Sequence, residues 1–277
     1  MSTFNLPDID PPCPVHLTND LSQDQLLSFP AFKIWSNTLR HSLSLQSKSD
    51  HEFNKAPYKL RSINIQSVDW FGSGEKKRLG FVKFQTEVTT DDGAYLPGSV
   101  LMRGGSVAML LVLQPDDVPA DQEKDKHVLV TIQPRIPAGS LAFAEIPAGM
   151  LDDSGSFSGG AAHEIEEETG LKVKAEELLD MTALAMENEQ SDEKLQKGVY
   201  TTPGGCDEFI PIMLYQKRVK RAELQEFQGK LTGLREEGEK ITLKVVKLED
   251  LWQEGVRDAK TLAAWALYQG LRSKGKL

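Results

Sequence analysis

A short acidic segment constrains this chain more than any other part of it. Residues 158–170 read Ser-Gly-Gly-Ala-Ala-His-Glu-Ile-Glu-Glu-Glu-Thr-Gly. Ser158 is a residue type that caps helix N-termini, and Gly170 is one that ends helices, so the segment predicts a short helix. The residues that would supply its apolar contacts are Ala161, Ala162 and Ile165.

Three of the four glutamates in this helix share one face. At about 3.6 residues per turn, Glu164 lies on the same side as Glu167 and Glu168, whereas Glu166 points away. Acidic side chains in a last turn face the negative end of the helix dipole, and a like-charge pair four residues apart costs about 0.2–0.5 kcal/mol. A divalent cation removes both penalties, and Mg²⁺ and Mn²⁺ prefer carboxylate oxygens. A solvated acidic helix face is the alternative that this short pattern leaves open.

The wider segment, residues 149–171, resembles the Nudix box, G-x5-E-x7-R-E-U-x-E-E-x-G-U, in which U is a bulky aliphatic residue. The matching positions are Gly149, Glu164, Ile165, Glu167, Glu168, Gly170 and Leu171. Two positions differ, because Gly155 replaces the first Glu and His163 replaces Arg. The resemblance implies a Nudix α/β/α sandwich with a mixed sheet, extended at its N-terminus by helical and strand elements.

Four pieces outside the box resemble the ADP-ribose and ADP-sugar diphosphatase branch of the Nudix hydrolases. They are Gln133-Pro-Arg135, Glu145–Gly149, Pro203–Glu208 and Glu236–Ile241. The plant-type ADP-sugar diphosphatases share the likeness through P-A-G-M-L-D-D, P-G-G-C-D-E and T-G-L-R-E. This resemblance covers about residues 60–270 and implies metal-dependent hydrolysis of the pyrophosphate of a nucleoside diphosphate sugar. The products would be a nucleoside monophosphate and a sugar phosphate.

The resemblance also assigns roles to individual residues. The Mg²⁺ or Mn²⁺ ligands that it implies are the Ala148 carbonyl, Glu164, Glu168 and Glu239. Glu237 is the expected base and Glu167 a further catalytic carboxylate, and which of Glu236, Glu237 and Glu239 takes the proton stays open. The substrate-binding residues that we expect are Arg135, Trp70, Arg103, Glu145, Gly204 and Glu208. His163 would support the ligands from a second layer, with direct metal binding as the alternative.

Three of these assignments also have a physical basis in the sequence. Arg135 follows a buried strand, where a guanidinium fork can grip a diphosphate; a surface ion pair is the alternative. Glu237 and Glu239 alternate ahead of a strand and so share a face, which lets one bind metal while the other accepts a proton; a charged loop is the alternative. Pro203-Gly-Gly gives a turn whose backbone can approach a ligand closely, unless it is a plain hairpin turn.

Composition limits the partners and the compartment. The net charge of −9 gives no basic footprint for nucleic acid, and the sequence has no apolar run of transmembrane length. Its two cysteines, Cys13 and Cys206, have neither metal-ligand nor redox spacing, which indicates a reducing compartment. We therefore expect a cytoplasmic protein, with the nucleus not excluded, that binds neither nucleic acid nor membrane.

The order of the patterns suggests two parts. We expect an N-terminal arm and helical element over residues 1–57, in which residues 1–18 are extended or disordered and Pro30 begins a helix. The Nudix domain would follow over residues 58–277, with strands in 58–104 at a homodimer interface. The other expected strands are 107–113, 127–133, 143–146, 178–186, 209–216 and 240–246, with a terminal helix over 261–272. The alternative to the enzyme is a non-catalytic or weakly active nucleotide-binding protein, which His163 and Gly155 favour.

Overall fold

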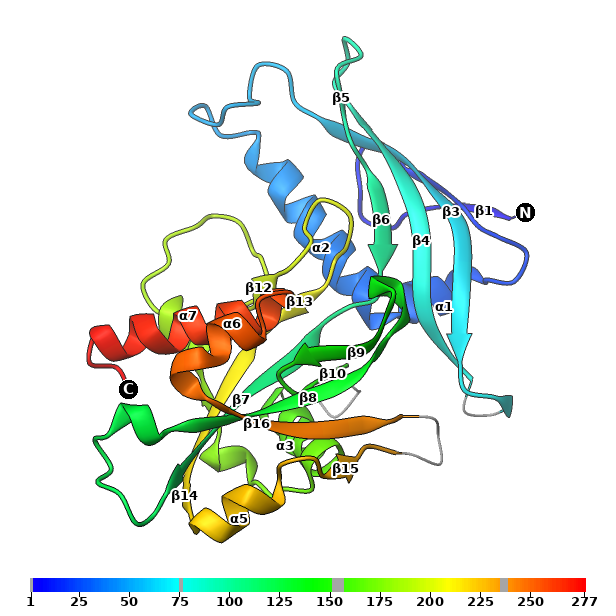
Figure 1. Ribbon diagram of the computed structural model, residues 1–277. Helices are drawn as coiled ribbons and strands as arrows, with labels where there is room; N and C mark the ends of the chain where they lie inside the picture. The colour runs from blue at the N-terminus through cyan, green and yellow to red at the C-terminus, as the bar shows by residue number, and fades with distance from the viewer. Residues whose placement is uncertain (1, 75–76, 151–156, 235–238) are drawn as a thin grey trace. The chain divides into compact units, whose positions relative to one another are not determined.

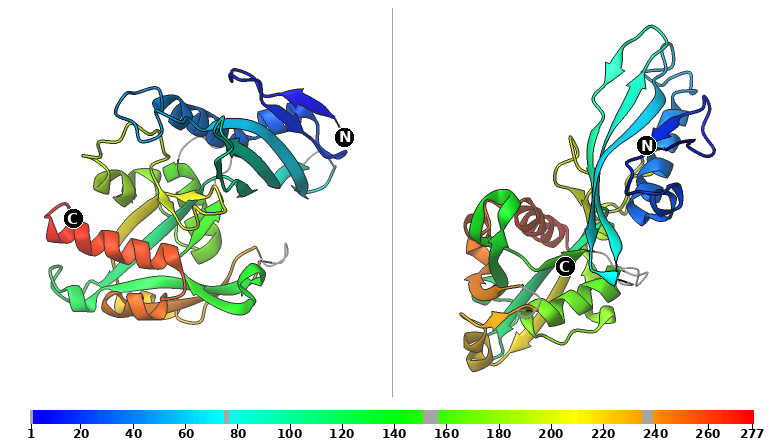
Figure 2. Two further views of the ribbon diagram at one scale, coloured as in Figure 1. Left: turned by 90° about the horizontal axis from the view of Figure 1, so that it is seen from above. Right: turned by 90° about the vertical axis from the view of Figure 1, so that its right-hand side faces the viewer.

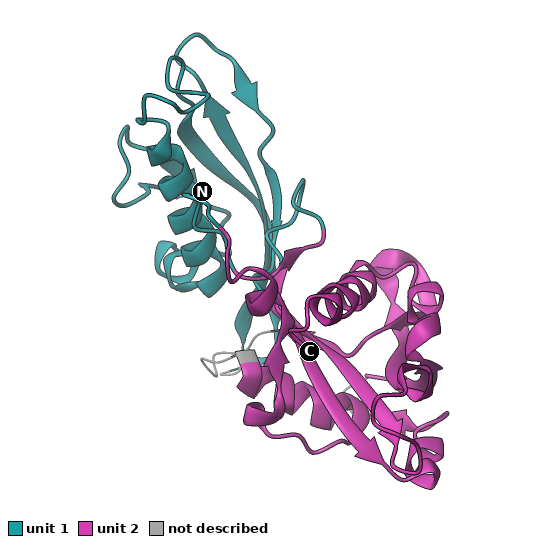
Figure 3. Cartoon of the chain, turned by 90° about the vertical axis from the view of Figure 1, so that its left-hand side faces the viewer, with its two compact units in different colours: residues 1–105, 190–196, 202–208 teal, residues 106–189, 197–201, 209–277 magenta. Residues whose placement is uncertain are grey.

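The computed structural model describes residues 2–74, 77–150, 157–234 and 239–277 and separates into two compact units (Figures 1 and 3). The first unit comprises residues 1–105, 190–196 and 202–208, and the second comprises residues 106–189, 197–201 and 209–277. The strands expected within residues 58–104 therefore belong with the N-terminal residues, and the acidic helix lies in the other unit.

The first unit is a six-stranded sheet with two helices against one face (Figure 3). Its strands are β1 (Thr3–Asn5), β2 (Pro14–His16), β3 (Lys59–Phe71), β4 (Arg78–Thr89), β5 (Tyr95–Leu96) and β6 (Ser99–Met102). Its helices are α1 (Gln23–Ser28) and α2 (Pro30–Leu45). The order is β1-β2-β3-β4-β5, and β6 pairs with β4. Phe32 and Phe84 join helix and sheet in the core between them.

The N-terminal arm is ordered, so the disordered alternative for residues 1–18 is wrong. Strand β2 pairs in parallel with β3, with Val15 opposite Ile63. Cys13, Val15 and Leu17 are buried, because the apolar residues between the prolines complete the core of this unit. The predicted helix start is confirmed, since Pro30 occupies the first turn of α2.

The second unit contains a mixed eight-stranded sheet in the order β11-β14-β7-β8-β16-β15, with β9 paired to β8 and β10 paired to β7. Strands β7 and β14 run parallel, and the remaining pairs are antiparallel. These strands are β7 (Ser106–Pro115), β8 (His127–Arg135), β9 (Ser140–Glu145), β10 (Ala148–Met150), β11 (Leu179–Asp180), β14 (Ile212–Val219), β15 (Leu231–Thr232) and β16 (Ile241–Lys247). A two-stranded ribbon, β12 (Val199–Tyr200) with β13 (Phe209–Ile210), stands apart from this sheet.

Helices cover both faces of this sheet, as alternate residues of β7 show. Leu111 packs toward the side of α3 (Phe157–Thr169) and α5 (Arg221–Glu226), and Leu110 packs toward the opposite side. That opposite side is covered by α4 (Met181–Ala185), α6 (Leu251–Glu254) and α7 (Ala259–Ser273). Helix α7 is the red C-terminal helix in Figure 2. Short 3-10 turns connect the elements at Glu123–Asp125, Ile136–Ala138, Ala175–Glu177 and Leu248–Asp250. The predicted α/β/α sandwich with a mixed sheet is confirmed.

Two local predictions are wrong. The strand expected over residues 178–186 stops after Asp180, whose side chain accepts the Ala183 N–H at 2.9 Å and caps helix α4. Ser158 is not a cap, because α3 already begins at Phe157; the residue before it lies outside the described ranges. Gly170 does end α3, with φ of 75° and its N–H bonded to the Glu166 carbonyl.

In the described ranges, none of the helices combines the length and the apolar content needed to cross a bilayer.

Candidate functional site

Glu168, in the last turn of α3, is a buried carboxylate of the second unit's acidic helix. Its side chain is only 2% exposed. One oxygen accepts the Ala148 N–H at 3.1 Å, and the other accepts the Gln133 amide at 3.4 Å. Burial, reinforced by the negative charges of Glu164, Glu239 and Glu145, raises the pKa of Glu168 to about 8. This environment favours either a proton or a cation at Glu168.

Gly149 brings the backbone of β10 against Glu164. A Cβ atom at Gly149 would lie 1.8 Å from the Glu164 carboxyl carbon, so the carboxylate occupies the space that any larger residue would need. Ala148 and Gly149 pair with Ala108 and Val107 of β7, which fixes this backbone. Two positions of the predicted box, far apart in sequence, therefore meet in space.

The remaining positions of the acidic helix separate as the helical spacing predicts. Glu166 is exposed and faces Lys172 at 3.6 Å. Glu167 is partly buried and lies 3.3 Å from Nδ1 of His163. The His163 side chain is 66% exposed, so it contacts one glutamate of the face from the solvent side. A second-layer role for His163 is compatible with this position and stays a prediction.

The expected metal ligands approach one another without forming a closed cluster. Glu239 accepts the Leu234 N–H at 2.9 Å, and its charge contributes to the raised pKa of Glu168. No three acidic, histidine or cysteine side chains among the described residues converge tightly enough to hold an ion. Glu164 and Glu239 still raise the pKa of Glu168, because electrostatic interactions act over longer distances than metal–ligand bonds. Glu168 and Glu239 each accept a backbone N–H, and Glu164 lies against the backbone of Gly149. The carboxylate donors fit Mg²⁺ or Mn²⁺ chemically.

Three other predicted residues lie outside the described part of the chain. Glu237, the expected base, and Glu236 fall within residues 235–238, which are outside the described ranges. Gly155 also falls outside them. The prediction that Glu237 takes the proton is therefore untested.

Arg135, at the end of β8, is anchored by a buried carboxylate. Its Nε donates to Glu145 Oε1 at 2.6 Å, and the other oxygen of Glu145 pairs with Lys260 Nζ. Lys260 lies 3.1 Å from Asp258, which caps α7. Both oxygens of Glu145 are thus engaged within the protein, and its charge is compensated by these two cations. No sequence pattern pointed to Lys260 or Asp258 as part of the site. An aspartate ahead of a helix signals a cap, but no spacing connects it to Glu145.

The other predicted substrate-binding residues belong to the first unit. Asp207 accepts the Arg103 N–H at 2.7 Å, and the Arg103 guanidinium pairs with Glu208 at 2.9 Å. Gly204 lies in the turn just before them, with open space where a Cβ would stand. Trp70 is near the end of β3, with Lys77 Nζ 4.8 Å from its ring centre. The unit therefore brings Arg103, Gly204 and Glu208 into one loop region.

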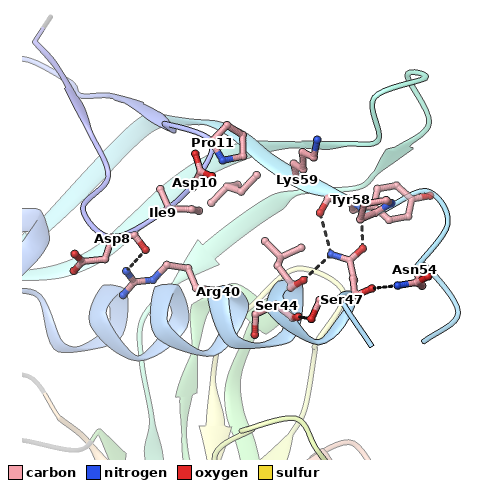
Figure 4. A pocket seen from close by; sticks show the side chains of 14 residues that line it. Asp8, Ile9, Asp10, Pro11, Arg40, Ser44, Ser47, Asn54, Tyr58 and Lys59 are labelled. Atoms are coloured by element: carbon pink, nitrogen blue, oxygen red, sulfur yellow. Dashed lines mark hydrogen bonds between the residues drawn. The ribbon is translucent and has the colours of Figure 1, made fainter. Parts of the chain in front are cut away.

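A separate cavity of about 440 Å³ lies in the first unit between α2, the N-terminal arm and the start of β3 (Figure 4). Arg40 donates to the carbonyls of Pro7 and Asp8, which ties the arm to the helix. Gln46 is buried and bonds both the N–H and the carbonyl of Tyr58. These polar groups connect parts of the protein to each other, and none of the predicted site residues lines the cavity.

Comparison with known proteins identifies the family. The model of the NUDIX domain matches residues 116–266, more than half of the chain. "Nudix hydrolase 14, chloroplastic" of Arabidopsis thaliana is 38% identical over 218 residues, which are 78% of this chain and 64% of the relative. A crystal structure described as an ADP compounds hydrolase aligns with a TM-score of 0.45 and 14% identity, over 79% of this chain and 99% of its own. That likeness is too weak to support a shared mechanism. On the domain match, which spans more than half of the sequence, the chain belongs to the Nudix family.

Proposed function

We propose that this protein hydrolyses the pyrophosphate bond of a nucleoside diphosphate sugar of the ADP-ribose or ADP-glucose type. The products would be a nucleoside monophosphate and a sugar phosphate. The observation that carries the proposal is Glu168, a buried carboxylate with a pKa raised to about 8 beside the Gly149 backbone and Glu164. The curated plant relative is named a hydrolase, and the four branch-like sequence pieces support the substrate class.

The carboxylates would hold Mg²⁺ or Mn²⁺ through Glu164, Glu168 and Glu239, together with the carbonyl of Ala148. Bound there, the ion would supply charge neutralisation at the diphosphate and a more acidic water molecule. The Ala148 N–H already orients Glu168, and Gly149 leaves room for Glu164, so both glutamates are held by the same short strand. The protein contributes mainly position and charge, as phosphoryl transfer to water requires.

Arg135 would bind the diphosphate oxygens. Its Nε is fixed by Glu145, and the guanidinium retains further N–H donors in a planar fork that matches phosphate geometry. We assign Glu237 as the base and Glu167 as a supporting carboxylate. Trp70, Arg103, Gly204 and Glu208 are proposed substrate contacts in a homodimer of the cytoplasmic protein.

The test is a substrate panel in which products are separated by chromatography. ADP-ribose, ADP-glucose, other nucleoside diphosphate sugars and dinucleotides are incubated with Mg²⁺ or Mn²⁺, and with a chelator as control. Release of AMP with ribose 5-phosphate or glucose 1-phosphate supports the proposal. Release of ADP with the free sugar would contradict it, because a different bond would have been cleaved.

A second function remains open because His163 and Gly155 replace two residues of the box. It is a nucleotide-binding protein with little or no turnover. Tight binding of the same ligands by calorimetry, combined with no hydrolysis across the panel, would support that function instead.

A further inference from the structure

A buried ion network connects the first turn of α7 with Arg135. Glu145 is 2% exposed and has a cation on each oxygen, Arg135 on one and Lys260 on the other. Lys260 is also buried, and its ammonium group reaches Asp258 at 3.1 Å. Because a buried charge without a partner is unfavourable, removal of any member changes the state of the others.

The same helix turn also holds the backbone that follows Glu145. Asp258 Oδ2 accepts both the N–H and the hydroxyl of Thr261. The Thr261 hydroxyl oxygen in turn accepts the Ile146 N–H at 3.0 Å. The α7 turn therefore fixes Glu145 through its side chain and Ile146 through its backbone, just ahead of Ala148 and Gly149.

The net charge around Arg135 depends on Lys260. Arg135 and Glu145 alone would form a neutral pair, and a neutral pair attracts an anionic diphosphate poorly. Lys260 compensates Glu145, and Asp258 lies at the N-terminal end of α7, where the helix dipole favours negative charge. The two cations and two carboxylates of the network therefore sum to zero, and loss of Lys260 would leave a net charge of about −1 around Arg135, which repels an anionic diphosphate.

Arg135 has donors left for a ligand. Its side chain is 41% exposed, and only its Nε is engaged by Glu145. Across the described residues, no hydrogen bond or ion pair occupies its two terminal nitrogens. A guanidinium held at Nε presents these nitrogens in one orientation, which favours a pair of hydrogen bonds to phosphate oxygens.

We propose that Lys260 is a positioning residue for diphosphate binding, which acts by compensating Glu145 so that Glu145 can orient Arg135 without cancelling its charge. This inference rests on the proposed function, because it assumes that the anion bound at Arg135 is the substrate's diphosphate. It predicts that Lys260 affects affinity more than turnover, since Lys260 itself does not touch the reacting atoms.

The experiment measures binding of the non-hydrolysable α,β-methylene analogue of ADP-ribose by calorimetry with Mg²⁺ present, alongside KM and kcat for ADP-ribose. Lys260→Met should weaken binding and raise KM by about tenfold, with kcat held within about threefold. The double variant Glu145→Gln with Lys260→Met removes both charges and keeps an acceptor for Arg135, so its affinity should return to within about threefold of wild type. The matched control is Lys244→Met, which breaks the surface pair with Glu254 and should leave the affinity unchanged.

Several results would overturn the inference. One is a folded Lys260→Met variant with wild-type affinity. Another is a folded double variant that stays as weak as the single one, which would make the lysine merely structural. If Lys260→Met does not fold, the double variant is compared with wild type, and an affinity at least about tenfold below wild type would contradict charge compensation. Absence of analogue binding by the wild type overturns this inference, whereas binding without hydrolysis overturns only the proposed function.

Discussion

Replacing Glu168 by glutamine should stabilise the metal-free protein, and the gain should grow with pH. Burial and three neighbouring glutamates raise the pKa of this carboxyl from 4.5 to about 8. A carboxyl whose pKa is higher in the folded state than in the unfolded chain destabilises the fold at high pH. This destabilisation begins as the pH rises above 4.5 and is complete near pH 8. Glutamine has the same shape and cannot ionise.

The magnitude follows from the difference between folded and unfolded pKa values. At pH 7 the unfolded chain has lost the proton and the folded protein has kept it, which destabilises the fold by about 3 kcal/mol at 1.36 kcal/mol per pKa unit. At pH 5 the same calculation gives about 1 kcal/mol, because the unfolded carboxyl is then only partly ionised. These are upper values, since the buried amide also needs hydrogen-bond partners.

Urea unfolding with a chelator present, at pH 5 and pH 7, measures this directly. Glu166→Gln is the matched control, because Glu166 is exposed on the same helix and its replacement should change stability little. Saturating Mg²⁺ should stabilise the wild type more than Glu168→Gln, because it binds the folded protein through that carboxylate. A variant that is no more stable than wild type at pH 7, or a gain that does not fall at pH 5, would refute the reasoning.

Three further predictions concern the box and the assembly. Gly149→Ala should displace the Glu164 carboxylate and lower kcat by at least about tenfold in steady-state assays. The control is Gly270→Ala, which has open space at its Cβ position and should retain full activity while the free energy of unfolding in urea rises by roughly 0.5 kcal/mol. His163→Arg should raise kcat if the histidine is only a weaker hydrogen-bond partner of the acidic face, and a fall in kcat would show a site adapted to imidazole. Light scattering at micromolar concentration should give a dimer of the 30.7 kDa chain, and a fully active monomer would contradict the proposal that the substrate is bound in a homodimer.

The acidic helix could be predicted from sequence because its determinants are local. Helical spacing separates the exposed Glu166 from the buried Glu168, and a glycine in the left-handed region ends the helix at Gly170. The strand β7 was equally clear, because a nearly continuous apolar run is typical of a strand whose two faces are both buried. Such features depend on neighbours within a few residues.

Contacts between distant residues could not be predicted in the same way. Lys260 meets Glu145 across 115 positions, and a lysine near a helix start is ordinarily solvated. The ordered arm depends on Val15 pairing beside Ile63, which no local pattern specifies. The strand expected after Leu178 became a helix because the Asp180 side chain offered a cap, a choice that propensity left undecided.

The most direct test of the proposed activity is chromatographic detection of products from ADP-ribose under single-turnover conditions, with Mg²⁺ and with a chelator. We predict AMP and ribose 5-phosphate in equal amounts with the metal, essentially none with the chelator, and a loss of at least about a hundredfold in rate for Glu164→Gln. Intact ADP-ribose after prolonged incubation with Mg²⁺ or Mn²⁺, with the other nucleotide sugars equally untouched, would contradict the assignment of this site as a pyrophosphate hydrolase.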